Sequence, residues 1–245
     1  MAKAQLMKKV QSFTDKLAEA DAAPLYELTP EEARKVLLSV QNIDIEVPDV
    51  RKQKINVKLR NGREMPVIIM KPADIDAELP VIFYIHGGGW VMGDDVTHDR
   101  LIRELADSVP AAVVFPVYQP SPEAQFPQTT NDLFAVLEYI VKNAGEYKLD
   151  ISNLVVAGDS VGGNMATVMA MMAKVQGNNP KIDFQLLFYP VTDSDFETES
   201  YHKFAEGPWL TKKAMQWFWN QYAPDENDRK NIYASPLKAS LEQLK

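Results

Sequence analysis

The segment Leu154-Val155-Val156-Ala157-Gly158-Asp159-Ser160-Val161-Gly162-Gly163-Asn164 leads from an apolar run through a glycine-rich turn. A helix-forming stretch, residues 165–175, follows at once, which is the strand–turn–helix context of a nucleophile elbow. So tight a turn leaves room only for glycine beside the serine, and Gly158 and Gly162 occupy those positions. It would lift the Ser160 hydroxyl from the strand end, with the positive end of a helix dipole behind it. A turn that serves packing alone is the alternative, and the flanks favour a nucleophile.

A second glycine-rich turn follows the apolar residues 81–85. It reads His86-Gly87-Gly88-Gly89-Trp90, and three glycines leave backbone N–H groups free to approach a ligand closely. A phosphate-binding loop would require Lys-Ser or Lys-Thr after the glycines, whereas a Trp-Val pair follows here. In ester hydrolases such a turn supplies one half of the oxyanion hole, and the residue after the nucleophile supplies the other. We therefore predict an oxyanion hole formed by the N–H groups of Gly88, Gly89 and Val161.

Together these motifs resemble those of the hormone-sensitive-lipase-like carboxylesterases, a branch of the α/β-hydrolase superfamily. The resemblance rests on residues 86–90, 118–123, 126–127, 158–163 and 189–190, and it extends from about Thr29 to the C-terminus. Val161 stands where the family usually has alanine, which leaves a backbone contact unchanged. The resemblance implies an α/β-hydrolase fold, with a mostly parallel sheet and helices on both faces. It also implies a serine carboxylic-ester hydrolase for short-chain acyl esters that forms an acyl-enzyme and needs no metal or other cofactor.

Bulk properties agree with a single α/β domain. The chain has 245 residues, 46% of them hydrophobic and 24% charged. Its net charge of −8 argues against a nucleic-acid partner, because the phosphate backbone would repel it. The absence of cysteine is compatible with a reducing compartment, and no run approaches the ~18 apolar residues of a membrane span. With no signal-peptide pattern at the N-terminus, we expect a cytoplasmic protein without a membrane span.

The N-terminal residues 1–42 are predicted to be helical. One apolar stripe at helical spacing is made by Leu6, Val10, Phe13 and Leu17. A second helix begins at Thr29, with Pro30 at its first position and Glu32 completing a capping box. These helices are interpreted as a cap over the active site, as in the resembled family, and a dimerisation or partner-binding arm is the alternative. Residues 43–245 form the predicted hydrolase core, in which the aromatic-rich residues 192–222 contribute to the cap.

Alternation of strands and helices supports that core. Residues 54–59 alternate polar and apolar side chains, and Asn61-Gly62 is a hairpin signal before the apolar residues 67–70. Further apolar strands are expected at residues 111–117 and 184–189, with helices between the strands. This order predicts a mostly parallel sheet after an antiparallel start.

Four residues near the two turns are predicted to support them rather than to react. Glu123 lies in the proline-rich loop 118–127, where an acid is usually solvated or binds backbone N–H groups. We interpret Glu123 as a support for the oxyanion loop. His86, Gly87 and Asp159 belong to the two motifs themselves and receive the same supporting role.

The remaining catalytic groups are not evident. Serine needs a histidine base oriented by an acid, and in this fold the chain order is Ser, acid, His. Only His202 follows Ser160, and both His98 and His202 are more typical of surface histidines. Asp193 and Asp195 follow the last predicted strand, a position that is not usual for the acid in this branch.

In the resembled family the acid follows a seventh strand and the histidine an eighth. Residues 234–237 resemble the segment before that seventh strand, so the expectation is a chain truncated before both groups. Residues 184–189 would then form an exposed apolar sheet edge prone to self-association, and the chain alone would be weakly active or inactive. The acid and base would come from a longer product or from another chain. Two further alternatives are a non-catalytic small-ligand-binding protein on the same scaffold and an inactive fragment.

Overall fold

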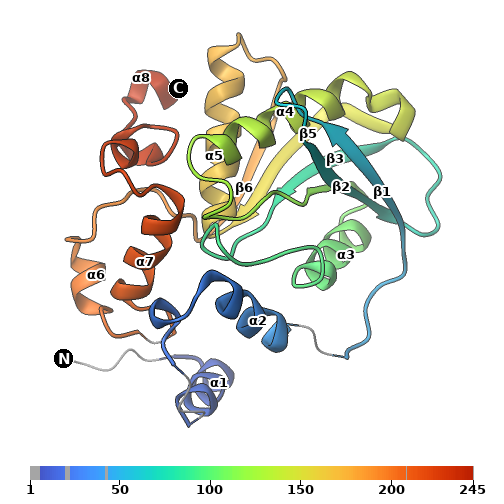
Figure 1. The fold of residues 1–245 in the computed structure, drawn as a ribbon. Coiled ribbons are helices and arrows are strands. Elements are labelled where there is room, and N and C mark those ends of the chain that lie inside the picture. The colour runs from blue at the N-terminus through green and yellow to red at the C-terminus, as the bar shows by residue number, and fades with distance from the viewer. Residues whose placement is uncertain (1–5, 20–22, 42–43, 208, 245) are drawn as a thin grey trace.

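The structure is a computed structural model that describes residues 6–19, 23–41, 44–207 and 209–244. Within these residues the chain forms a six-stranded sheet of order β1-β2-β4-β3-β5-β6 (Figure 1). The strands are β1 (Val50–Lys58), β2 (Glu64–Pro72), β3 (Leu79–Ile85), β4 (Ala112–Pro116), β5 (Leu149–Asp159) and β6 (Phe184–Phe188). β1 and β2 form an antiparallel hairpin, β2 pairs antiparallel with β4, and the strands from β4 to β6 are parallel. The predicted antiparallel start and mostly parallel sheet are confirmed.

Helices cover both faces of this sheet. The main helices are α1 (Lys8–Glu19), α2 (Pro30–Gln41), α3 (Asp99–Ser108), α4 (Gln128–Lys142), α5 (Val161–Val175) and α7 (Lys212–Tyr222), and the shorter ones are α6 (Glu199–Lys203) and α8 (Leu241–Leu244). Because strand side chains alternate, Phe83 and Ile85 join the core beneath α4 and α5, whereas Ile82 and Tyr84 face α3. The fold class predicted from the sequence is therefore confirmed.

Local signals in the sequence account for the first elements of the chain. The Thr29 N–H donates to Glu32 Oε2 at 2.9 Å, and the Glu32 N–H donates back to Thr29 Oγ1 at 3.3 Å. This reciprocal capping box begins α2 where the motif predicted it. In the β1–β2 turn, Asn61 Oδ1 accepts from the Arg63 N–H, and Gly62 adopts a φ of 83° that glycine tolerates best.

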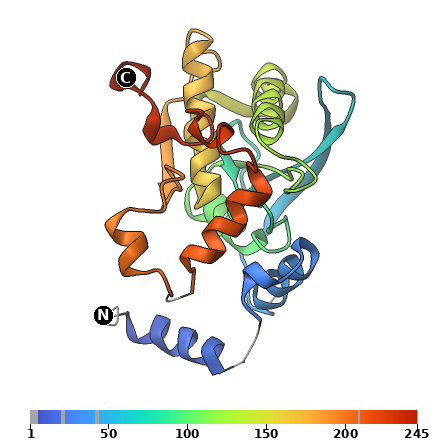
Figure 2. The same ribbon diagram turned by 60° about the vertical axis from the view of Figure 1, so that its left-hand side comes forward.

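Helices from the two ends of the chain lie side by side beyond the sheet. Figure 1 shows α1 and α2 below the sheet and α6 and α7 at its lower left, and Figure 2 shows these helices around the same end of the molecule. The rings of Phe13 and Trp209 lie 5.9 Å apart, and Lys213 Nζ lies 5.6 Å from the Tyr26 ring centre. α7 also packs on the loop after β3, where Tyr222 stacks on Trp90 with ring centres 4.2 Å apart. Residues 1–5, 20–22, 42 and 208 of the predicted cap segments lie outside the described residues.

The β6 strand forms one edge of the sheet, as the sequence predicted. Its first residue, Phe184, is 62% exposed, and Tyr189 just beyond its end is 77% exposed. Large apolar side chains on an open strand edge are a favourable surface for pairing with another chain. In the part of the chain that the structure describes, none of the helices has the length and apolar character needed to cross a bilayer.

Candidate active site

Ser160 lies in the turn between β5 and α5 in a backbone conformation that only glycine adopts without strain. Its φ is 53° and its ψ is −118°. The turn is anchored because the Ser160 N–H donates to Phe188 O of β6 at 2.9 Å. A Cβ on Gly158 would overlap the backbone of Gly162, and one on Gly162 would overlap the carbonyl of Ile85. The two glycines that flank the serine are thus required by close packing of β5, α5 and β3.

Two glycines after β3 also occupy positions where a side chain would not fit. Gly88 has a φ of 112° and Gly89 a φ of 66°, both in the left-handed half of backbone space. A Cβ on Gly88 would overlap the carbonyl of Met92, and one on Gly89 would overlap the Phe218 ring. The turn is closed by the Met92 N–H, which donates to Gly88 O at 2.8 Å.

The Asp159 carboxylate links the two turns. Its Oδ1 accepts from the Gly87 N–H at 2.9 Å and from the Tyr84 hydroxyl at 2.8 Å, and His98 Nε2 lies 3.6 Å away. Burial raises the pKa of Asp159, but the His98, Tyr84 and Gly87 donors outweigh it, so the pKa of Asp159 lies below its ordinary value. Asp159 is therefore ionised at neutral pH and holds the glycine turn against the serine turn.

Ser160 opens into a cavity of about 520 Å³ between the sheet and the helices from both chain ends. It is lined by Leu25, Leu37, Gln41, Gly88, Gly89, Met92, Thr97, His98, Leu101, Asp159, Ser160, Tyr189, Trp209, Leu210, Met215 and Phe218. Most of these side chains are apolar, and the polar ones are Gln41, Thr97, His98, Asp159 and Ser160 besides the Tyr189 hydroxyl. The site thus places a serine hydroxyl beside a glycine-lined backbone turn in a pocket with mostly apolar walls.

His86 is buried within the support of the glycine turn. Its ring is fully inaccessible and stacks on Tyr118 with centres 4.2 Å apart. Burial lowers the pKa of His86 to about 3, so the ring is neutral when the protein is folded at neutral pH. Nδ1 lies 2.7 Å from Gly87 O, and a neutral ring protonated at Nδ1 donates to that carbonyl. The structure thus places the His86 ring against the Gly87 carbonyl.

Glu123 contacts the glycine turn through Arg34, which the sequence reading did not single out. Arg34 donates from Nη1 and Nη2 to the two carboxylate oxygens of Glu123 at 2.9 and 2.6 Å. The same guanidinium donates to Val91 O at 2.8 Å and to Ser121 O at 2.9 Å. Arg34 holds the pKa of Glu123 below its ordinary value by these bonds. An arginine on the polar face of a predicted helix carries no local signal for such a partner.

The histidine that follows Ser160 in the chain lies outside the cavity. His202 is on α6, with 61% of its side chain exposed and Nε2 3.2 Å from Glu197. Asp193 pairs with Lys238 at 2.7 Å, and Asp195 accepts from the Glu197 N–H. The structure brings none of these three predicted candidates to the cavity lining in the described parts of the chain.

His98 corrects the sequence reading. It was expected to be a surface histidine, but only 12% of its side chain is exposed and it lines the cavity with Ser160. Its Nδ1 lies 3.0 Å from Thr97 Oγ1 and its ring centre 5.1 Å from that of His86. The physical reason is the close return of the chain at Gly93, where a Cβ would lie 2.6 Å from His86 Nδ1. That return carries residues 94–98 back against the glycine turn.

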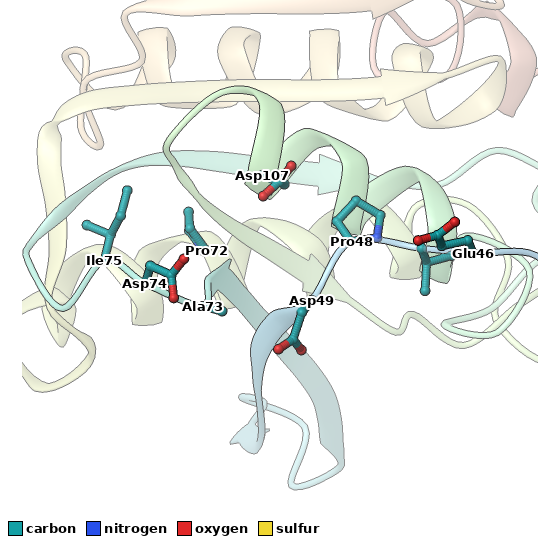
Figure 3. A pocket seen from close by; sticks show the side chains of 9 residues that line it. Glu46, Pro48, Asp49, Pro72, Ala73, Asp74, Ile75 and Asp107 are labelled. Atoms are coloured by element: carbon teal, nitrogen blue, oxygen red, sulfur yellow. The ribbon is translucent and has the colours of Figure 1, made fainter.

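A second cavity of about 650 Å³ lies at the start of β1, the end of β2 and α3 (Figure 3). Its titratable lining residues are Glu46, Asp49, Asp74 and Asp107. Carboxylates alone offer neither a nucleophilic hydroxyl nor an oxyanion site, and no group of three or more His, Asp or Glu suited to a metal ion is found among the described residues. The chemistry is therefore assigned to the cavity of Ser160.

The fold and the site define an α/β protein that presents a serine hydroxyl beside a glycine-lined backbone turn. The chain belongs to the alpha/beta hydrolase fold family, which it matches over residues 82–245. It is 40% identical over 231 residues to an alpha/beta hydrolase of Acanthamoeba polyphaga mimivirus, a match that covers 94% of this chain. It is 37% identical over 189 residues to an esterase of Gibberella moniliformis, which covers 77% of this chain.

A solved structure of an esterase is also similar to this chain. The thermostable esterase of Pseudomonas putida is 41% identical and superposes with a TM-score of 0.95 over 100% of this chain and 76% of its own. The predicted resemblance to carboxylesterases is thereby confirmed. The chain spans 65% and 59% of the lengths of the mimiviral and Gibberella relatives, which is less than two thirds of each.

Proposed function

We propose that this chain is a serine carboxylic-ester hydrolase. Ser160 Oγ attacks the ester carbonyl carbon, and its proton passes to a base. The N–H groups of Gly88, Gly89 and Val161 hold the tetrahedral oxyanion, which collapses to an acyl-enzyme as the alcohol leaves. Water then attacks the acyl carbon and releases the acid. The observation that carries the proposal is the Asp159 carboxylate, which holds the glycine turn against the Ser160 turn at one cavity.

The substrate class follows from the cavity. Its walls are mostly apolar and its volume is about 520 Å³, which suits a short acyl chain and a small alcohol. The names of the relatives favour an esterase over the non-catalytic ligand-binding alternative. We do not assign a metal or other cofactor to this chemistry, and we expect no nucleic-acid partner from the net charge of −8.

The rate of this chain by itself should be low. Activation of Ser160 requires a histidine base with its acid, and in the described parts of the chain no hydrogen bond joins the Ser160 hydroxyl to any of the three histidines. Loss of the base leaves a residual acceleration of about 10³ to 10⁴ over water in related serine enzymes, which the oxyanion hole supplies. Slow but Ser160-dependent turnover is the expected behaviour.

Three further assignments are part of the proposal. Residues 1–42 and 192–222 form a cap, because Leu25 and Leu37 line the Ser160 cavity together with Trp209 and Leu210. The exposed β6 edge mediates self-association of the chain. The protein acts in the cytoplasm, as its cysteine-free sequence suits a reducing compartment.

Hydrolysis of p-nitrophenyl butyrate by the purified 27.6 kDa chain tests the proposal, with Ser160→Ala as the matched control. We expect release of p-nitrophenolate above the rate of the alanine variant. Phosphonylation by a p-nitrophenyl phosphonate, read by intact mass, tests the nucleophile separately from turnover. Equal butyrate rates for both proteins, with no adduct on the unmodified chain, would overturn the assignment of Ser160.

A further inference from the structure

Two donors bind one oxygen of Asp159, and the His98 ring lies beside the same atom. The Gly87 N–H and the Tyr84 hydroxyl donate to Oδ1 at 2.9 and 2.8 Å, and His98 Nε2 lies 3.6 Å from the same atom. Both partners of the His98–Asp159 pair are largely buried, with 12% and 15% of their side chains exposed. In such a poorly solvated place the pair interacts more strongly than a surface pair would.

We propose that His98 is a positioning residue for ester hydrolysis. Through Asp159 it fixes the Gly87 peptide, and through that peptide it fixes the oxyanion N–H groups of Gly88 and Gly89. The inference rests on the proposed esterase function of the Ser160 site.

The orientation of His98 is set by its own neighbour. Thr97 Oγ1 lies 3.0 Å from His98 Nδ1 and 3.1 Å from Asp94 O, and it accepts from the Asp94 N–H at 2.9 Å. A protonated imidazole carries a proton on Nε2, and a neutral imidazole does so when the Thr97 hydroxyl donates to Nδ1 rather than to Asp94 O. In these two forms an N–H of His98 faces the Asp159 carboxylate. The second histidine against it, His86, stays neutral because it is buried.

The Gly87 peptide is sensitive to the position of this carboxylate. A Cβ on Gly87 would overlap Asp159, so the two groups are in direct packing contact. Gly88 and Gly89 follow with φ values of 112° and 66°, and a rotation of the Gly87 peptide is passed directly to their N–H groups. Misplacement of catalytic donors by about 1 Å costs on the order of 100-fold in rate. Asp159 also has no other side-chain cation among its described contacts that could replace His98.

Glycine-selective ¹⁵N labelling of the full chain gives a direct readout, because the sequence has only eleven glycines. Hydrogen exchange of the Gly87 amide would be measured in the unmodified chain, in His98→Leu and in His98→Gln. We expect exchange of the Gly87 amide to accelerate by about tenfold or more in the leucine variant, because leucine no longer fixes the Asp159 carboxylate that accepts its hydrogen bond. The glutamine variant keeps an amide donor where Nε2 stood and should stay within about threefold of the unmodified chain. His202→Leu, a change on exposed α6, is the matched control and should leave Gly87 unchanged.

Kinetics supply the second readout. For p-nitrophenyl butyrate, kcat of His98→Leu should fall by about 10- to 100-fold with little change in KM, and His98→Gln should recover most of it. If the leucine variant does not fold, Thr97→Val tests the same link by removing the hydroxyl that orients His98, and Gly87 exchange should accelerate there. A folded His98→Leu or Thr97→Val with unchanged Gly87 exchange would overturn the inference. An unmodified chain without Ser160-dependent chemistry would overturn the proposed function instead, and the Gly87 amide would still test the link to His98.

Discussion

Arg34 and Glu123, 89 positions apart in the chain, form an ion pair through two hydrogen bonds of 2.9 and 2.6 Å. The same arginine binds the carbonyls of Val91 and Ser121, so one side chain joins α2 to the turn after the glycines and to the proline-rich loop. The sequence predicted Glu123 as a support of the oxyanion loop. In the structure the Glu123 carboxylate binds Arg34 of α2, and it is Arg34 that binds the carbonyls of the two loops.

Arg34→Ala should destabilise the chain by about 1 to 3 kcal/mol, because two carbonyls and a carboxylate lose a charged donor. Glu123→Gln should cost less, about 0.5 kcal/mol, since the Glu123 side chain is 47% exposed and its charge is well solvated. Urea unfolding followed by circular dichroism measures both changes. Lys35→Ala, which removes the exposed pair with Glu31 one residue along the helix, is the control and should stay within about 0.5 kcal/mol of the unmodified chain. An Arg34→Ala midpoint equal to that of Lys35→Ala would contradict the role of Arg34.

Ser160→Gly should abolish ester hydrolysis and also stabilise the fold. Ser160 is held at a φ of 53° and a ψ of −118°, which is strained for any residue with a Cβ and accessible to glycine. We expect a gain of about 1 kcal/mol over Ser160→Ala, which keeps the Cβ and the strain. Thermal unfolding of the two inactive variants side by side gives the comparison. A glycine variant no more stable than the alanine variant would show that the elbow is unstrained.

The two glycine turns could be predicted because their signals are local. Gly158 and Gly162 must lack side chains where β5, α5 and β3 approach one another, and such a requirement is visible in a short motif. The capping box at Thr29 is local in the same sense, as two residues three positions apart, Thr29 and Glu32, make both of its hydrogen bonds.

The contacts of Arg34 and His98 could not be predicted in this way. Arg34 binds partners 57 to 89 positions away in the chain. Nothing in the local sequence distinguishes it from the other polar residues on the exposed face of the same helix. His98 lies in a polar stretch that is typical of the surface, and it is buried only because the chain returns at Gly93. Such long-range packing decides which polar residues are buried, and local composition therefore cannot predict them.

Asp159→Asn should change the pH dependence of stability as well as activity. The pKa of Asp159 is held below its ordinary value in the folded chain. The ionised carboxylate therefore adds to the free energy of unfolding above the unfolded pKa of about 3.9, and this added stability is lost as pH falls through the folded pKa. Asparagine keeps an acceptor for the Gly87 N–H but binds no proton in that range. We expect it to be less stable at pH 7 by about 1 to 3 kcal/mol, with a shallower loss of stability below about pH 4. Urea midpoints from pH 2 to pH 7 test this, and parallel curves for the two proteins would contradict it.

Phe218→Ala should shift the substrate preference towards longer acyl chains. The Phe218 ring lies against Gly89 and lines the cavity, so its removal widens the space beside the oxyanion turn. The ratio of kcat/KM for p-nitrophenyl octanoate to that for the acetate should rise about tenfold, since each added methylene that is buried contributes about 0.8 kcal/mol. Phe204→Ala removes a ring that is 40% exposed and is absent from the cavity lining, which makes it the matched control. An unchanged ratio would place the acyl chain elsewhere in the cavity.

Phe184→Lys should reduce self-association of the chain. Phe184 begins the outer strand of the sheet and is 62% exposed, and a lysine on an open edge disfavours pairing with a second strand. Sedimentation equilibrium should show species heavier than 27.6 kDa for the unmodified chain and a smaller fraction of them for the variant. Val175→Lys is the control, because this side chain is 76% exposed but lies at the end of α5 rather than on the strand edge. If both substitutions reduce the association equally, the added charge and not the β6 edge is responsible. An unmodified chain that is monomeric at high concentration would rule out the β6 interface.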